Sequence, residues 1–184
     1  MVARMPYGPV KCFWVEPAGK FRAFVKLKAE DERKCLGDFD TEALAQLATQ
    51  PYWDRDEAEH STRAPLYRLP DGSLVVSNEL PPGALYDADY LHEEYPMPDG
   101  ICLVGVCPNG HHWICDSRAS NCTMPEDKVH RCWVRHGDPR TGKVHVDKEG
   151  CTCKAGAGSI MCGGDPGTEK HYHGHLHNGE FTAG

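Results

Sequence analysis

Ten cysteines and eleven histidines among 184 residues constrain this chain more than any other feature of its sequence. Their thiol and imidazole groups are soft or borderline metal ligands, and their number exceeds what packing requires. A protein made in a reducing cytoplasm does not normally use ten cysteines for disulfides. An even number of cysteines permits complete pairing without showing it. We therefore expect the fold to be cross-linked by zinc, by disulfides or by both.

The charge balance excludes two classes of partner. Twenty basic residues against 27 acidic ones give a net charge of −7. A sequence-independent hold on nucleic acid or on an anionic membrane requires a basic surface, so we expect neither partner.

Residues Met1 to Glu16 contain no apolar stretch behind a basic start, which predicts a chain without a signal peptide. The longest apolar run, Ile101 to Cys107, is too short to span a bilayer.

The first 60 residues predict a hairpin and a helix. Residues Cys12–Glu16 and Phe21–Leu27 are rich in aromatic and β-branched side chains, and Pro17-Ala18-Gly19 lies between them as a turn. Residues Thr41–Thr49 predict a helix that Asp40 or Thr41 caps and Pro51 ends. One face of this helix would cover the hairpin, and it carries Leu44, Leu47 and Ala48.

From Pro65 onward the pattern indicates strands and turns. The dipeptides Asp71-Gly72, Asn109-Gly110 and Asn178-Gly179 each separate two short segments that we expect to be strands, as β-hairpin turns do. The sequence thus predicts an α+β fold, mostly short antiparallel β-hairpins with one helix near the N-terminus. We expect a hairpin-plus-helix region at 1–60 and a Cys/His-rich β domain at 61–184, joined by an acidic linker at 54–59.

The first candidate metal element is Cys107-Pro108-Asn109-Gly110-His111. A tight turn can aim a thiolate and an imidazole at one tetrahedral zinc ion, and Cys115 follows further on. The usual version has two ligands about three positions apart, whereas His111 lies four after Cys107. The alternative is a plain hairpin whose cysteine is a small core residue.

The second candidate is a group of one histidine and four cysteines, of which four side chains could close a structural metal site. His130 and Cys132 are one residue apart, so both would face the same side of a strand. A disulfide from Cys122 to Cys132 or Cys153, or free buried thiols, are the alternatives. The group consists of Cys122, His130, Cys132, Cys151 and Cys153.

The third candidate is the run from His171 to His177. On a strand its alternate residues share one face, so the imidazoles of His171, His173, His175 and His177 would lie together, with Cys162 near in sequence. Zinc, copper or iron would suit such a site. The alternative is the exposed polar face of an edge strand. A cupin motif is excluded, because the chain ends before the strands and second histidine motif that a cupin barrel needs.

Two further patterns carry less weight. The glycine-rich stretch Ala155 to Ser159 has neither the following helix nor the lysine of a phosphate-binding loop, which favours simple tight turns. Cys122 with His145 and Asp147 can be written as a Cys-His-Asp set, but such sets arise by chance in a chain with this composition.

Six segments follow one another in a specific order, and they are Leu80–Ala84, Asp116–Cys122, Cys132–Gly137, Val144–Lys148, Thr152–Ile160 and His173–Leu176. With them the chain resembles an uncharacterised family of tailed-bacteriophage proteins, from near Leu66 to the end of the chain. The resemblance implies a phage origin, no established activity, and importance for Cys122, Cys132, His136, Asp147, Cys153 and His173. The chain departs from the family near its end, where His175 replaces an aromatic residue and His177 follows.

Together these features lead us to expect a non-enzymatic accessory protein of a phage particle, on the capsid or the tail, cross-linked by zinc or disulfides. It would be made in the host cytoplasm and enter the virion, with other phage structural proteins as partners in an oligomeric assembly. One alternative is a metal-dependent hydrolase that uses the C-terminal histidines with an open coordination position. Another is a host-directed binding protein made early in infection.

Overall fold

The computed structural model describes residues 7–119, 121–125, 130–151, 153, 159–165, 168 and 170–184. These residues form two compact units. We call residues 15–80 the sheet-and-helix unit, and residues 7–14 with 81–184 the Cys/His-rich unit. The glycine-rich stretch 155–158 and Gly167 lie outside the described residues. No helix of the described part of the chain is long and apolar enough to cross a membrane.

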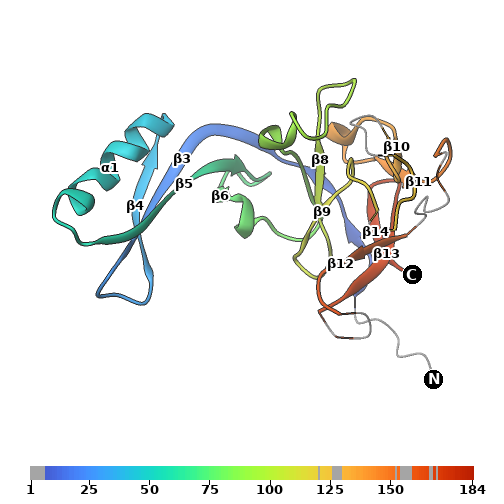
Figure 1. The fold of residues 1–184 in the computed structure, drawn as a ribbon. Coiled ribbons are helices and arrows are strands. Elements are labelled where there is room, and N and C mark those ends of the chain that lie inside the picture. The colour runs from blue at the N-terminus through green and yellow to red at the C-terminus, as the bar shows by residue number, and fades with distance from the viewer. Residues whose placement is uncertain are drawn as a thin grey trace. The chain divides into compact units, whose positions relative to one another are not determined.

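The sheet-and-helix unit is an antiparallel four-stranded sheet in the order β4-β3-β5-β6, with the helix α1 packed beside β3 (Figure 1). Its buried side chains include Ala23, Val25, Leu66 and Tyr67. Its elements are β3 (Glu16–Leu27), β4 (Arg33–Phe39), α1 (Glu42–Asp54), β5 (Ala58–Arg68), β6 (Leu74–Val76) and a 3-10 turn, η1 (Ser77–Glu79).

The predicted N-terminal hairpin is wrong in its pairing. Residues 17–19 do not reverse the chain but lie inside the long strand β3, whose register with β5 shifts between Pro17 and Phe21. Gly19 has a φ of 65° there, which places the turn-forming residues in a bulge. The hairpin partner of β3 is β4, so the chain reverses between Leu27 and Arg33 instead.

The helix is confirmed, but its end and its buried face differ from the prediction. Thr41 caps α1, and its Oγ1 accepts a hydrogen bond from the Leu44 amide at 3.2 Å. Pro51 lies inside the helix, which continues to Asp54. The buried helix residues are Ala45 and Thr49, whereas Leu44 and Leu47 are 47% and 63% exposed. The small residues let the helix approach the sheet closely, so the leucines point away from it.

The strand β5 also crosses both the expected linker and the expected border at residue 60. It begins at Ala58 and pairs with β3 along most of its length. Residues 61–80 therefore belong to the same compact unit as the helix.

The Cys/His-rich unit contains three small sheets, in the orders β2-β7-β8-β9, β1-β14-β13-β12 and β10-β11. All pairs are antiparallel except β2 with β7. Among the described residues no strand of this unit exceeds six residues. Its elements are β1 (Val10–Lys11), β2 (Phe13–Trp14), β7 (Ala84–Asp87), η2 (Asp89–Leu91), β8 (Leu103–Val106), β9 (His112–Ile114), β10 (Val134–His136), η3 (Pro139–Thr141), β11 (His145–Asp147), β12 (Ile160–Cys162), β13 (Tyr172–His177) and β14 (Glu180–Ala183).

The turn dipeptides predicted from the sequence all close hairpins. The pairs β5–β6, β8–β9 and β13–β14 are joined at Asp71-Gly72, Asn109-Gly110 and Asn178-Gly179. Asn178 and Gly179 have φ values of 49° and 77°, as the tightest hairpin turns require. The α+β class, with antiparallel hairpins and one helix, is confirmed.

A buried ion pair joins segments of the Cys/His-rich unit that have little regular structure. The Arg135 side chain is 7% exposed, and its Nε lies 3.1 Å from Oδ1 of Asp116, which is 1% exposed. Arg135 Nη2 also donates to the Ile101 carbonyl at 2.9 Å and to Asp99 at 2.6 Å. The second Asp116 oxygen accepts the Leu103 amide at 2.7 Å. Burial raises the pKa of Asp116, and the Arg135 charge opposes that rise.

We predict that Arg135→Ala lowers the free energy of unfolding by about 3–5 kcal/mol at pH 7, because it leaves Asp116 buried without its counter-charge. A carboxyl whose pKa is raised in the folded state binds protons more tightly there than in the unfolded chain. The deficit should therefore shrink as the pH falls from 7 to 5. Denaturant titration followed by tryptophan fluorescence measures both effects.

The matched control is Arg140→Ala, which removes an exposed arginine 3.7 Å from Asp138. Exposed pairs contribute about 0–1 kcal/mol, so this variant should unfold nearly as the parent does. Equal losses in the two variants would contradict the role assigned to Arg135.

Candidate metal centre

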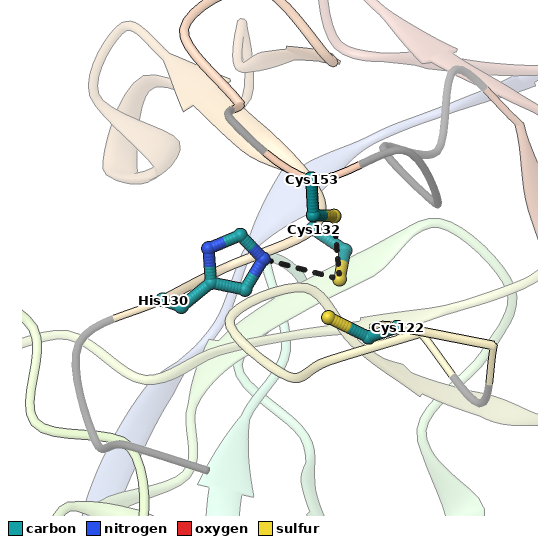
Figure 2. A group of neighbouring side chains, drawn as sticks. All are labelled: Cys122, His130, Cys132 and Cys153. Carbon is teal, nitrogen blue, oxygen red and sulfur yellow. Dashed lines mark hydrogen bonds between the residues drawn. The ribbon is translucent and has the colours of Figure 1, made fainter. Parts of the chain in front are cut away.

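Four side chains of the Cys/His-rich unit bring their donor atoms within 4.8 Å of one another, and they are three cysteines and one histidine (Figure 2). Cys132 is buried, whereas Cys122 and His130 are half-buried. They come from the loop after β9, from the segment just before β10, and from the stretch between β11 and β12. The members of this cluster, the Cys3His cluster, are Cys122, His130, Cys132 and Cys153.

The separations between donor atoms match those of a tetrahedral zinc site. Cys132 Sγ lies 3.7 Å from Cys153 Sγ and 3.7 Å from His130 Nε2. Two thiolates bound tetrahedrally at ~2.3 Å from zinc are about 3.8 Å apart, and a thiolate and an imidazole slightly less. A disulfide would need about 2.05 Å between sulfurs, so the 3.7 Å contact is not one. The residues present therefore fit a metal ion.

Arg118 shapes the loop that presents Cys122. Its guanidinium donates to the carbonyls of Met124 and Pro125 at 2.6 and 2.8 Å, and to Cys122 Sγ at 3.4 Å. The Cys122 amide closes a turn by donating to the Ala119 carbonyl at 2.9 Å. One cationic side chain thus closes the loop and places positive charge beside the sulfur. The sequence predicted no role for Arg118, although an arginine four residues before Cys122 was a usable signal.

The thiols of the cluster differ in acidity because their surroundings differ. The hydrogen bond from Arg118 and a backbone hydrogen bond from Met124 lower the pKa of Cys122 to about 6. Burial, together with hydrogen bonds to the neighbouring thiols, raises the pKa of Cys153 to about 12. Burial also raises the pKa of Cys132, while a backbone hydrogen bond from Ala119 opposes the rise. Cys122 is therefore the first of these thiols to lose its proton as the pH rises, and the thiolate is the form that binds a metal ion.

Cys132 is also tied to the core by its neighbour. Trp133 packs edge-to-face on Trp113, with 5.6 Å between ring centroids, and its Nε1 donates to the Ser159 carbonyl at 3.1 Å. The sequence predicted that His130 and Cys132 face the same side of a strand. Both do face the cluster, but they precede β10 and are not part of a strand. The fifth residue of the predicted group, Cys151, lies outside the four, with its Sγ 3.5 Å from Cys153 Sγ.

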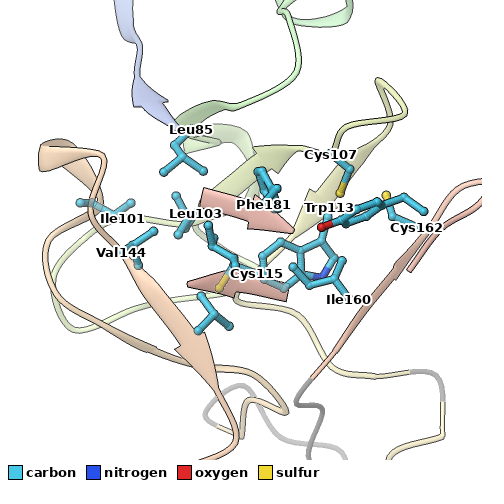
Figure 3. Close-up of a cluster of buried hydrophobic side chains, with 13 residues drawn as sticks. Leu85, Ile101, Leu103, Cys107, Trp113, Cys115, Val144, Ile160, Cys162 and Phe181 are labelled. Carbon is cyan, nitrogen blue, oxygen red and sulfur yellow. The ribbon is translucent and has the colours of Figure 1, made fainter. Parts of the chain in front are cut away.

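The other predicted metal elements do not bring three or more donor atoms together within the described residues. Cys107 and His111 close the β8–β9 turn through the Cys107 amide and the His111 carbonyl at 2.8 Å, as a plain hairpin does. Cys107 and Cys115 are buried in the hydrophobic core, where Cys162 also lies (Figure 3). All ten cysteines are free thiols in this structure, so none of the expected disulfides is formed.

The C-terminal histidines divide between different surroundings. His171 is buried, and its Nδ1 lies 2.8 Å from the Gly163 carbonyl oxygen. His173, His175 and His177 alternate along β13 with the buried Tyr172, Gly174 and Leu176, so these three share a face as predicted.

No family model, curated protein or solved structure matches this chain. The interpretation of the Cys3His cluster therefore depends on its own geometry.

We predict that Cys122 of the metal-free chain is alkylated by iodoacetamide with half-maximal rate near pH 6, because the pKa of its thiol is lowered to about 6. Peptide mass spectrometry measures the rate at Cys122, with the exposed Cys35 as a reference for the reagent. Arg118→Ala should move the midpoint toward about 8.5, the value of a free thiol. A midpoint near 8.5 in the parent chain would show that this loop does not form without metal.

Proposed function

We propose that the Cys3His cluster is a structural zinc centre that holds the loops of the Cys/His-rich unit together. The observation that carries this proposal is the convergence of Cys122, His130, Cys132 and Cys153 at the separations of a tetrahedral site. Three thiolates and one imidazole are a donor set that zinc commonly takes in structural sites. Oxygen-preferring ions such as Mg²⁺ or Ca²⁺ would bind poorly to sulfur.

A structural role is favoured over a catalytic one because protein side chains fill all four positions. Catalytic zinc normally has three protein ligands and keeps one position for water or substrate. The location supports the same conclusion, since the described residues between β9 and β10 form neither strand nor helix. An ion bound there would join this loop to Cys153, 21 positions after Cys132 in the sequence. Such a cross-link replaces backbone pairing that short strands do not supply.

A hydrolase centred on His171, His173 and His175 receives no such support. His171 is buried against the Gly163 carbonyl, and these three residues belong to no converging group among the described residues.

We predict one zinc ion per chain in protein purified without chelators, measured by elemental analysis. Cys132→Ser should lose the ion, because it removes the most deeply buried ligand of the cluster. Cys151→Ser is the matched control, since it removes a thiol 3.5 Å from a ligand but outside the four, and it should keep one ion. Removal of zinc from the parent chain should lower the melting temperature by about 10 °C or more. A zinc-free native protein, or an unchanged melting temperature after chelation, would contradict the proposal.

We further propose that the chain is a non-enzymatic accessory protein of a tailed-phage particle, on the capsid or tail, with other structural proteins of the particle as its partners. The sequence resemblance supports this role, and a metal cross-link suits a protein that must survive outside a cell. Mass spectrometry of purified particles should detect the chain in fixed proportion to the major structural proteins. Its absence from particles, with expression only early in infection, would instead support a host-directed binding protein.

A further inference from the structure

A second group of polar side chains lies on one face of the two-stranded β10–β11 sheet. His136 and His145 are directly opposite each other in the register, and their ring centroids are 6.2 Å apart. Asp147 is two residues beyond His145, so it lies on the same face of the sheet. The side chains of directly paired residues have Cβ atoms about 4.5–5.5 Å apart, a separation from which two imidazoles can reach one ion.

Asp147 orients both imidazoles. Its Oδ1 lies 3.1 Å from His136 Nε2, and its Oδ2 lies 3.2 Å from His145 Nε2. The Glu149 amide anchors the carboxylate by donating to Oδ1 at 2.7 Å. A neutral imidazole that donates from Nε2 keeps its lone pair on Nδ1. Metal-binding histidines almost always have a partner of this kind on the nitrogen that does not bind the ion.

His177 contributes a third imidazole from a different sheet. Its ring centroid is 4.3 Å from that of His145, and 5.5 Å from that of His175. Partial loss of solvent around the ring, together with the neighbouring His145 and His175, lowers the pKa of His177, and Asp147 opposes this effect. The lowered pKa favours the neutral form of the ring, which is the form that binds metals. His177 is also exposed at the end of β13.

We infer that His136 and His145, both oriented by Asp147, form with His177 a second metal site, for a borderline divalent ion such as Zn²⁺, Ni²⁺ or Cu²⁺. Imidazole is a preferred ligand of these ions. The donor atoms of these three histidines are not all within 4.8 Å of one another in the structure, so binding requires rotation of the rings. The side chains of His136 and His145 are 45% and 31% exposed, which leaves them room for it. Three protein ligands leave at least one coordination position for water or for a ligand from another molecule. An ion at this second site would therefore be open to other ligands and able to exchange. In the Cys3His cluster, by contrast, protein side chains would occupy all four coordination positions.

The test is a titration of the full chain, purified without a histidine tag, with Ni²⁺ followed by calorimetry. We expect one Ni²⁺ to bind with a Kd in the micromolar range. His145→Ala should weaken this binding at least thirtyfold, because it removes the central imidazole. Asp147→Asn should weaken it about tenfold while all three imidazoles remain. The matched control is His92→Ala, since His92 Nε2 contacts Asp87 Oδ1 at 2.6 Å and that pair lies outside the proposed site. The control variant should bind Ni²⁺ as the parent does.

NMR of the imidazole resonances locates the ion independently of the variants. Paramagnetic Ni²⁺ at substoichiometric amounts should broaden His136, His145 and His177 before His171 and His173. The backbone spectrum of each variant shows whether it is folded. Absence of Ni²⁺ binding below about 100 μM, unchanged affinity in folded His145→Ala, or broadening centred on His171 would each overturn the inference. The titration is made after one equivalent of Zn²⁺ has been added, because the thiolates of an empty Cys3His cluster would take up Ni²⁺ in place of the histidines.

Discussion

The buried contact between Arg135 and Asp116 positions both sides of the Cys3His cluster. Asp116 is two residues before Arg118, which holds the Cys122 loop, and Arg135 is three residues after Cys132. The same guanidinium reaches the Ile101 carbonyl, so one side chain joins three segments of a unit with very short strands. The donor atoms of the cluster can meet only if these segments are in place. A metal ion would then reinforce an arrangement that the ion pair has already defined.

The two groups of candidate metal ligands in this unit differ in chemistry and in access. The Cys3His cluster has three sulfur donors and one imidazole, and Cys132 among them is buried. It offers four protein ligands to one ion. The group around Asp147 has nitrogen donors, lies on an exposed face, and offers three. The first arrangement suits a permanent cross-link, and the second suits an ion that exchanges or that also binds another molecule. The net charge of −7 is compatible with cation binding at both places.

Local features were predicted well from the sequence, and long-range ones were not. The three Asx-Gly turns and the Thr41 cap were found because each depends on a few adjacent residues. The pairing of β3 was missed because a bulge at Gly19 can hold residues that otherwise form a turn. The exposed face of α1 was missed because the sheet accepts the small Ala45 and Thr49 in close contact, leaving Leu47 outside.

The sequence by itself determined the chemistry that this chain can offer, namely thiols and imidazoles in an acidic chain of short hairpins. It also limited the second candidate metal site to five residues, because the types of ligand side chain and their spacing along the chain are local properties. Only the tertiary structure decided that Cys122, His130, Cys132 and Cys153 converge while Cys151 lies outside. It alone brought His177 of β13 against His145 of β11. The physical reason is that meetings between distant segments depend on core packing and on buried charges such as Arg135, which no local pattern encodes.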